Sequence, residues 1–404
     1  MAGEEPVAGT DFTVEQIVER IRRELGTDAV AKRCAVAPLK EAKGLLSNVL
    51  RLTVDWSDVN SGLPSTFLIK VPSSEVIKTQ GIASGDFDEI EENARVQAAH
   101  NCECEFYRIA RGCEKELRIP RCYMEEEMLA EGGRHGLLVL EDLSADCHVR
   151  RLTEPEPMSL ALLKEIVDAL AALQAFALKN VDKWKGNEKL NVRIIDLQLL
   201  NAKKLPGMLQ EAVVGMKALW PDRFEPLADR LLAAYRSHED IAYAFQEHVR
   251  MAMPAVLVHG DFHAANILLR READGSERLA AIIDWQVVHA GSAAEDIVRL
   301  LSTSVHASVR REHTSTLLRH YYESLADRLR PQPVPFTLEQ VEQAYGRLFK
   351  FGVLAIAQGL PFIPKWEFPG SDKEKAALEV ALDRSEALIE DMVAIENGGP
   401  KPWQ

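Results

Sequence analysis

Three short apolar runs inside an otherwise helical half of the chain constrain the fold most strongly. They lie at residues 255–258, 266–270 and 279–285, and Asp274-Gly275, a typical hairpin-turn dipeptide, joins the last two. Apolar runs of this length, bounded by turn residues, predict β-strands. The sequence around them has helical periodicity, over residues 159–178, 292–330, 337–358 and 372–396. We therefore expect a small β element set within a helical domain.

The N-terminal part has a different pattern. Residues 13–25 predict an amphipathic helix, and from Leu50 to Trp56 apolar and polar residues alternate as in a half-buried strand. The run TFLIKV, which stops at Pro72, predicts a second strand in an antiparallel pair. Further elements are predicted as a helix at 88–111 and a strand at 136–143. The composition changes near residue 143, so we expect two domains, 1–142 and 143–404, of the α+β class.

Charge and composition exclude several classes of function. The 404 residues carry a net charge of -14, which repels nucleic acid and anionic membranes. No run is apolar enough to span a bilayer, and the acidic N-terminus lacks the features of a secretory signal. The six cysteines show no paired CxxC spacing, which is typical of reduced thiols. We expect a cytoplasmic protein with no nucleic-acid or membrane partner and no evident obligate protein partner.

Polar residues at the ends of the predicted strands point to phosphoryl transfer. In VLVHGDFHAANILL, Asp261 follows one strand and Asn266 begins the next, and Asp284 ends the apolar run AAIID. This chemistry needs a carboxylate that orients the attacking hydroxyl, and oxygen ligands for Mg²⁺. Asp261 fits the first role as the catalytic base, Asn266 and Asp284 fit the second, and His259 is expected to brace the loop. The alternative is an ordinary turn followed by a strand-ending aspartate; the order of all the parts favours ATP and Mg²⁺.

A lysine on the TFLIKV strand extends the predicted site. Lys70 lies on the face opposite Phe67 and Ile69, where it could contact the phosphates of a nucleotide. Such a lysine is usually held by a glutamate from a helix, and the segment NCECEFYR offers Glu103 and Glu105. The spacing does not choose between them. The single Gly44 before the first strand gives weak support for a phosphate-covering loop, since one glycine in a turn is common.

The segment after Asp284 predicts the start of a helix. Ser292 and Glu295 have the spacing of a capping box, and Asp296 follows in the first turn. Asp296 could interact with the helix dipole, or it could accept hydrogen bonds from the backbone of the loop that carries Asp261. The sequence leaves both open.

With these residues in place, the chain resembles the ecdysteroid kinase-like, or CHK kinase-like, family, which is related to choline and aminoglycoside kinases. The likeness covers most of the chain, through KGLLSNVLRLTV, LIKV, ECEFY, LVLEDL, VLVHGDFHAANIL and AAIIDWQVVHAGSAAEDIVRLL. It implies a two-lobed protein-kinase-like fold, with a small antiparallel N-lobe and a large helical C-lobe.

The resemblance also implies roles for single residues. It makes Glu103 the partner of Lys70, Asp261 the base, and Asn266 and Asp284 the metal ligands. The backbone from Glu141 to Leu143 is expected to contact adenine. Phosphate contacts are expected near Ser47 and Asn48, although this chain departs from protein kinases in that the loop over the phosphates is almost free of glycine.

The expected activity is transfer of the γ-phosphate of ATP to a hydroxyl of a small molecule, such as a steroid-like or other lipophilic alcohol. A choline- or ethanolamine-type aminoalcohol is the alternative acceptor, for which aromatic residues in the C-terminal half would surround the cation: Tyr345, Phe349, Phe351, Trp366 and Phe368. The same aromatics could instead pack the core. A third hypothesis is a catalytically silent fold that only binds nucleotide.

Overall fold

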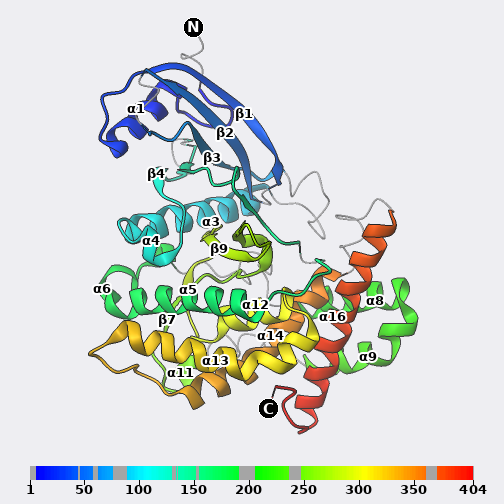
Figure 1. Ribbon diagram of the computed structural model, residues 1–404. Coiled ribbons are helices and arrows are strands. Elements are labelled where there is room, and N and C mark those ends of the chain that lie inside the picture. Colours follow the sequence, from blue (N-terminus) through cyan, green and yellow to red (C-terminus); the bar gives the residue numbers. More distant parts are fainter. Residues whose placement is uncertain are drawn as a thin grey trace. The chain divides into compact units, whose positions relative to one another are not determined.

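The computed structural model describes residues 6–43, 46–57, 62–75, 89–129, 133, 135–151, 154–190, 205–235, 247–360 and 371–403. The chain forms two compact units. Unit 1 comprises Met1–Cys147 with two later segments, Gly186–Val192 and Ile282–Val288, and unit 2 comprises the remainder. Both units can be followed in Figure 1.

Unit 1 is built on a five-stranded sheet in the order β1-β2-β3-β5-β4. Its elements in chain order are α1 (Val14–Leu25), β1 (Ala31–Lys43), β2 (Ser47–Trp56), β3 (Thr66–Pro72), α3 (Glu89–Ala110), α4 (Glu114–Leu117), β4 (Cys122–Glu126), β5 (Leu137–Glu141) and the short helix η1 (Glu188–Leu190). Every neighbouring pair in the sheet is antiparallel. Figure 1 shows β1, β2 and β3 side by side.

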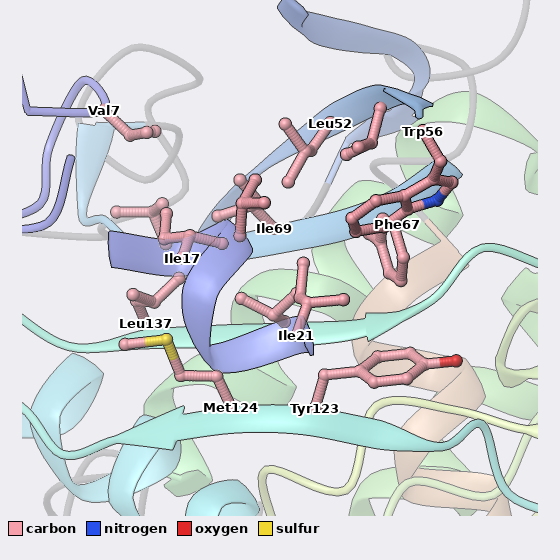
Figure 2. Close-up of a cluster of buried hydrophobic side chains, with 14 residues drawn as sticks. Val7, Ile17, Ile21, Leu52, Trp56, Phe67, Ile69, Tyr123, Met124 and Leu137 are labelled. Atoms are coloured by element: carbon pink, nitrogen blue, oxygen red, sulfur yellow. The ribbon is translucent and has the colours of Figure 1, made fainter. Parts of the chain in front are cut away.

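The side chains of β3 divide between the two faces of this sheet. Phe67 and Ile69 are fully buried, and they join a core that includes Ile17 and Ile21 of α1 (Figure 2). Burying each of these large side chains contributes about 1.5–3 kcal/mol. Since alternate residues of a strand point to opposite faces, Lys70 lies on the other face. The register places Lys70 opposite Val49 of β2 and Leu138 of β5.

Unit 2 is mostly helical. Its helices are α5 (Leu160–Lys179), α6 (Val181–Trp184), α8 (Leu205–Leu219), α9 (Pro221–Ala234), α11 (Glu247–Arg250), η2 (Ala264–Asn266), α12 (Glu295–Thr303), α13 (Ala307–Leu329), α14 (Leu338–Gly359) and α16 (Asp372–Glu396). The dense apolar sequence of α5 is buried along most of its length. Helix α14 approaches α12 closely, because a Cβ built on Gly352 would lie 2.6 Å from the Cβ of Ser302.

The strands of unit 2 form two small sheets. Strand β7 (Val256–Val258) pairs antiparallel with β10 (His289–Gly291). Strands β8 (Ile267–Arg271) and β9 (Glu277–Ile282) lie beside β6 (Cys147–His148), and Gly275 in the turn between β8 and β9 has a φ of 83°. Glycine adopts this left-handed backbone without steric cost. The predicted hairpin is confirmed, although β9 ends at Ile282, two residues before Asp284.

The predicted fold class is confirmed: the protein is α+β, with an antiparallel N-terminal sheet and a mostly helical C-terminal part. Helix α3, which carries Glu103 and Glu105, lies in sequence between β3 and β4. Among the described residues, no helix has the length and apolar character needed to cross a membrane.

Candidate active site

In unit 1, Lys70 of β3 contacts two carboxylates. Its Nζ atom lies 2.5 Å from Oε2 of Glu103 on α3 and 2.5 Å from Oδ1 of Asp284. The side chains of Lys70 and Glu103 are 12% and 1% exposed, so this cluster is largely shielded from water. Glu105, the other glutamate that the sequence offered, forms an ion pair with Arg108 instead. The structure thus brings together Lys70, Glu103 and Asp284.

The ammonium group of Lys70 and the two carboxylates stabilise one another's charged forms. Burial lowers the pKa of Lys70, but the attraction of the Asp284 and Glu103 carboxylates outweighs it and raises that pKa above its ordinary value. Lys70 therefore stays protonated at physiological pH. Burial raises the pKa of Glu103, against the attraction of Lys70. An ammonium group has three donors, so Lys70 keeps one beyond its two carboxylate contacts.

The backbone at Asp284 turns sharply after β9. Asp284 has a φ of 69°, a conformation that is uncommon for residues other than glycine and that often marks a functional site. Its Oδ2 atom accepts a hydrogen bond from Nε2 of Gln286 at 3.1 Å. The next residue, Trp285, is fully buried and stacks on Phe106 of α3 with ring centroids 4.0 Å apart. These contacts fix the segment that presents the Asp284 carboxylate.

In unit 2, a tight loop follows β7 and carries the predicted base. Gly260 has a φ of 84°, which gives this loop its turn. The carboxylate of Asp296 accepts hydrogen bonds from the backbone N–H groups of His259 (2.7 Å) and Gly260 (3.0 Å). The His259 ring is fully buried, and its Nδ1 atom accepts a hydrogen bond from the N–H of Asp261 at 3.2 Å. Of the two roles considered for Asp296, the structure shows the contact with the loop backbone.

The predicted capping box at Ser292 is wrong. Helix α12 begins at Glu295 with Ala294 as its N-cap, and no side chain caps it. The Glu295 carboxylate pairs with His289 of β10 at 2.9 Å, and both side chains are 1% exposed. Glu295 is thus paired with a buried side chain and does not cap the helix. Burial raises the pKa of Asp296 to about 7, although the two backbone hydrogen bonds oppose the shift.

Asp261 is held by two basic side chains. Nη2 of Arg299 on α12 donates to its Oδ1 atom at 2.6 Å, and Nε2 of His263 lies 3.4 Å from Oδ2. Burial raises the pKa of Asp261, but His263 and Arg299 outweigh it, so the pKa lies well below the ordinary range. Sequence reasoning missed Arg299. One arginine in a helix gives no local signal, and only its spacing of three from Asp296 could have suggested a shared face.

Asn266 is oriented by its own loop. Its Nδ2 atom donates to the backbone carbonyl of Asp261 at 2.9 Å, and the residue is 7% exposed. Because the amide nitrogen is used in this way, the carbonyl oxygen Oδ1 points elsewhere. Among the described residues, Oδ1 makes no hydrogen bond within the protein. A neutral oxygen donor fixed in this way has the chemistry of a ligand for a hard cation.

The predicted adenine and phosphate contacts lie in unit 1. Ser47 is buried at the start of β2, whereas Asn48 is exposed. The carbonyl of Leu143 accepts hydrogen bonds from the N–H groups of Asp146 and Cys147. Strand β5 ends at Glu141, whose backbone N–H donates to the carbonyl of Arg121 at 2.8 Å.

Another contact that sequence reasoning missed fixes the segment after β5. Nε of Arg51 donates to Asp142 at 2.8 Å, and Asp142 also accepts a hydrogen bond from the N–H of Ser144 at 3.0 Å. The segment that is expected to meet adenine is therefore anchored to the sheet.

The candidate aromatics for binding a cation belong to the core where the structure describes them. Tyr345 is fully buried, Phe349 and Phe351 are 1% and 6% exposed, and Trp403 packs against the first two with centroids 4.9 and 5.0 Å away. Three positions named above, Gly44, Trp366 and Phe368, lie outside the described residues.

The chain is similar to two proteins of Caenorhabditis elegans. It is 24% identical over 378 residues to "Uncharacterized oxidoreductase dhs-27", a match that covers 89% of this chain and 42% of that protein. The chain thus spans less than half of the length of this relative. It is 23% identical over 392 residues to "Uncharacterized kinase-like protein D1044.1", covering 94% of this chain and 98% of that protein.

Among solved structures, the choline kinase of Cryptosporidium parvum is similar at 12% identity with a TM-score of 0.47, covering 90% of this chain and 92% of that one. The DUF1679 family, described as "Uncharacterized oxidoreductase dhs-27", matches residues 5–398, and the chain belongs to this family.

Proposed function

We propose that the protein is an ATP-dependent kinase that phosphorylates a hydroxyl group of a small molecule. The hydroxyl oxygen forms a bond to the γ-phosphorus, and the bond from this phosphorus to the β,γ-bridging oxygen breaks. ADP leaves with the electron pair, and the hydroxyl proton passes by way of Asp261, the proposed base, to solvent. The observation that carries the proposal is the buried contact of Lys70 with Glu103 and Asp284, because this trio is the nucleotide-binding arrangement of kinases.

The two units supply different parts of the proposed reaction. In unit 1, Lys70 would grip the α- and β-phosphates while Glu103 holds its ammonium in place, and the backbone from Glu141 to Leu143 would meet adenine. In unit 2, Asp261 would accept the hydrogen bond of the attacking hydroxyl. The expected domains, 1–142 for the nucleotide and 143–404 for catalysis and the acceptor, remain part of this proposal.

The chemistry of two side chains, one in each unit, supports magnesium as the proposed metal. Asn266 and Asp284 offer an amide oxygen and a carboxylate, the hard ligands that Mg²⁺ prefers, and Asn266 already has its nitrogen engaged by the Asp261 carbonyl. When bound, the ion would neutralise phosphate charge. Lys70 holds Oδ1 of Asp284 in the structure, so we expect this contact to loosen when phosphates attract the ammonium.

A lipophilic, uncharged alcohol is the acceptor that we favour, in line with the resemblance to ecdysteroid kinase-like proteins. An aminoalcohol such as choline would need open aromatic faces around its cation. The described aromatic candidates, Tyr345, Phe349 and Phe351, are all buried, and the first two pack against each other, so they offer no open face. The six cysteines form no disulfide, which suits the cytoplasmic location that we propose.

The name of the relative dhs-27 suggests a second candidate, an oxidoreductase. Enzymes that bind dinucleotides on a doubly wound fold carry a GxGxxG turn after a parallel strand. No two glycines of this chain are separated by a single residue, so this turn is missing from the sequence. The kinase-like relative also matches over nearly its whole length. Both observations favour the kinase.

A phosphorylation screen tests the proposal. The purified chain is incubated with ATP, Mg²⁺ and a pool of cellular metabolites, and products are sought by the mass increase of one phosphoryl group. The Asp261→Asn variant serves as the inactive blank and should still bind Mg·ATP. Asp274→Asn, a change in the exposed turn between β8 and β9, serves as the matched control and should stay active. If wild-type protein forms no phosphorylated product while binding ATP, a silent nucleotide-binding protein becomes the better description.

A further inference from the structure

Helix α12 and the residue that follows it hold the loop of Asp261 at three points. Asp296 accepts hydrogen bonds from the backbone at the start of the loop, and Ser304 accepts one from the N–H of Ala264 at 2.8 Å. Between these two, Arg299 contacts Asp261 itself. Asp296 and Arg299 are three residues apart, so they lie on one face of the helix. The helix therefore fixes both the backbone and the reactive side chain.

The two oxygens of Asp261 are not equivalent. Oδ1 receives the guanidinium of Arg299 at 2.6 Å, a short, charge-assisted hydrogen bond. Oδ2 faces His263 at 3.4 Å, which is longer than a good hydrogen bond of this kind. The Asp261 side chain is 16% exposed, so part of the carboxylate remains accessible. Oδ2 is thus the oxygen with capacity to accept a further hydrogen bond.

We propose that Arg299 is a positioning residue that holds Asp261 through Oδ1, so that Oδ2 is presented to the hydroxyl of the acceptor. The inference deepens the proposed kinase function and rests on it. In this role Arg299 acts on the reaction only through Asp261. Its Nε atom is buried and makes no hydrogen bond among the described residues, so Arg299 holds Asp261 through Nη2.

This role has a specific kinetic consequence. Misplacing a reacting group by about 1 Å can lower a rate about 100-fold. Replacing Arg299 with methionine removes the contact to Oδ1, and the carboxylate can then rotate away from the hydroxyl. We expect kcat to fall about 100-fold while the KM for ATP is unchanged, because the nucleotide contacts are made by other residues.

Two further variants separate positioning from general stability. Lysine can reach Oδ1 but lacks the planar fork of arginine, so Arg299→Lys should recover about 10-fold of the lost activity. In an Asp261→Asn background, which is inactive, Arg299→Met should lower the melting temperature by less than it does in the wild-type background, since the residue through which Arg299 acts is already changed.

The buried pair of Arg310 and Asp391 provides a matched control. These side chains are 1% and 6% exposed and lie 2.6 Å apart. Arg310→Met also removes a buried arginine, but Asp391 keeps Arg311 as a partner at 2.8 Å. This variant should lower the melting temperature and leave the kcat of the folded protein near that of wild type.

The experiment measures kcat and KM for each variant, with ATP hydrolysis as the assay where the acceptor is unknown, and the melting temperatures of the single and double variants. An Arg299→Met protein with wild-type kcat, or a double variant whose loss of melting temperature is the sum of the two single losses, overturns the positioning role while the kinase function stands. If wild-type protein turns over no ATP, the kinase proposal fails instead. Non-additive melting temperatures would then still report the Arg299–Asp261 contact.

Discussion

Lys70 Nζ lies 2.5 Å from a carboxylate oxygen of Glu103, and this contact links strand β3 to helix α3 inside unit 1. Neither charge would be stable there alone, because a buried ion without a partner costs several kcal/mol. The pair is therefore both a structural bond of unit 1 and, in the proposed function, the device that aims an ammonium group at phosphate. These two roles can be separated by substitution.

Replacing Lys70 with methionine should destabilise the protein and remove nucleotide binding. The change leaves Glu103 buried without its cation, and breaking a buried pair in this way costs about 3–5 kcal/mol. Measurements are the free energy of unfolding by urea and the binding of Mg·ATP by calorimetry. Lys70→Met with full ATP affinity would contradict the role assigned to the lysine.

A double variant, Lys70→Met with Glu103→Leu, provides the control. Replacing both members of a buried pair by apolar residues is often nearly neutral. We therefore expect it to be more stable than Lys70→Met alone, but equally unable to bind ATP. This outcome would show that loss of binding does not follow from loss of stability.

Replacing Asn266 with alanine should weaken the binding of Mg²⁺ at the proposed site. The structure leaves Oδ1 of Asn266 without a hydrogen bond among the described residues, and alanine has no oxygen to offer an ion. We expect the Mg²⁺ concentration for half-maximal ATP hydrolysis to rise by about 10-fold or more. Adding Mg²⁺ in the presence of ATP should also raise the melting temperature of this variant by less than it raises that of wild type. An unchanged Mg²⁺ requirement would remove Asn266 from the metal site.

Asp296 should make stability depend on pH. Its pKa in the folded protein is raised by burial to about 7, above the value of about 3.9 for an unfolded aspartate. The folded state then binds more protons between these values, so this contribution to stability is fully present below about pH 4 and is lost as pH rises towards 7.

The Asp296→Asn variant tests this linkage. Its amide has no proton to lose, so the decrease in the free energy of unfolding between about pH 4 and 7 should become smaller than in wild type. The variant should also be less stable by about 1–3 kcal/mol, because one of the two N–H groups of His259 and Gly260 loses a good acceptor. Parallel pH curves for the two proteins would show that Asp296 does not titrate in this range.

Several elements could be predicted because their signals are local. The alternation in β3 predicts its two faces, and Asp274-Gly275 predicts the turn between β8 and β9. Strand β1 escaped prediction because its sequence, AKRCAVAPLKEAK, mixes charged residues and a proline with small apolar ones. Within the described part of the chain it lies at the edge of the sheet beside β2, where charged residues and proline are tolerated.

The candidate site also contains residues that the sequence suggested and residues that it did not. His259, Asp261, Asn266 and Asp284 lie in short segments next to strands, so their order in the sequence suggested their chemistry. Arg299 gave no such signal, because its contact with Asp261 joins residues 38 positions apart. Spacing alone did not choose between Glu103 and Glu105, which lie two residues apart on different sides of α3; the resemblance favoured Glu103, and in the structure Glu103 contacts Lys70. Patterns within one element are visible in a sequence, whereas pairings between elements are not.

The close approach of α14 to α12 gives a last prediction, which connects packing to the site. A Cβ on Gly352 would lie 2.6 Å from the Cβ and 2.1 Å from the Oγ of Ser302 on α12. Gly352→Ala should therefore force the helices apart and destabilise the protein by about 1–3 kcal/mol. Because α12 carries Asp296 and Arg299, we also expect a lower kcat.

Gly207→Ala in α8 is the matched control for this prediction. A Cβ there meets nothing within 4 Å, so the change should stabilise the protein by about 0.4–1 kcal/mol. If Gly352→Ala lowers stability but leaves kcat at the wild-type value, the loop of Asp261 does not depend on the exact position of α12.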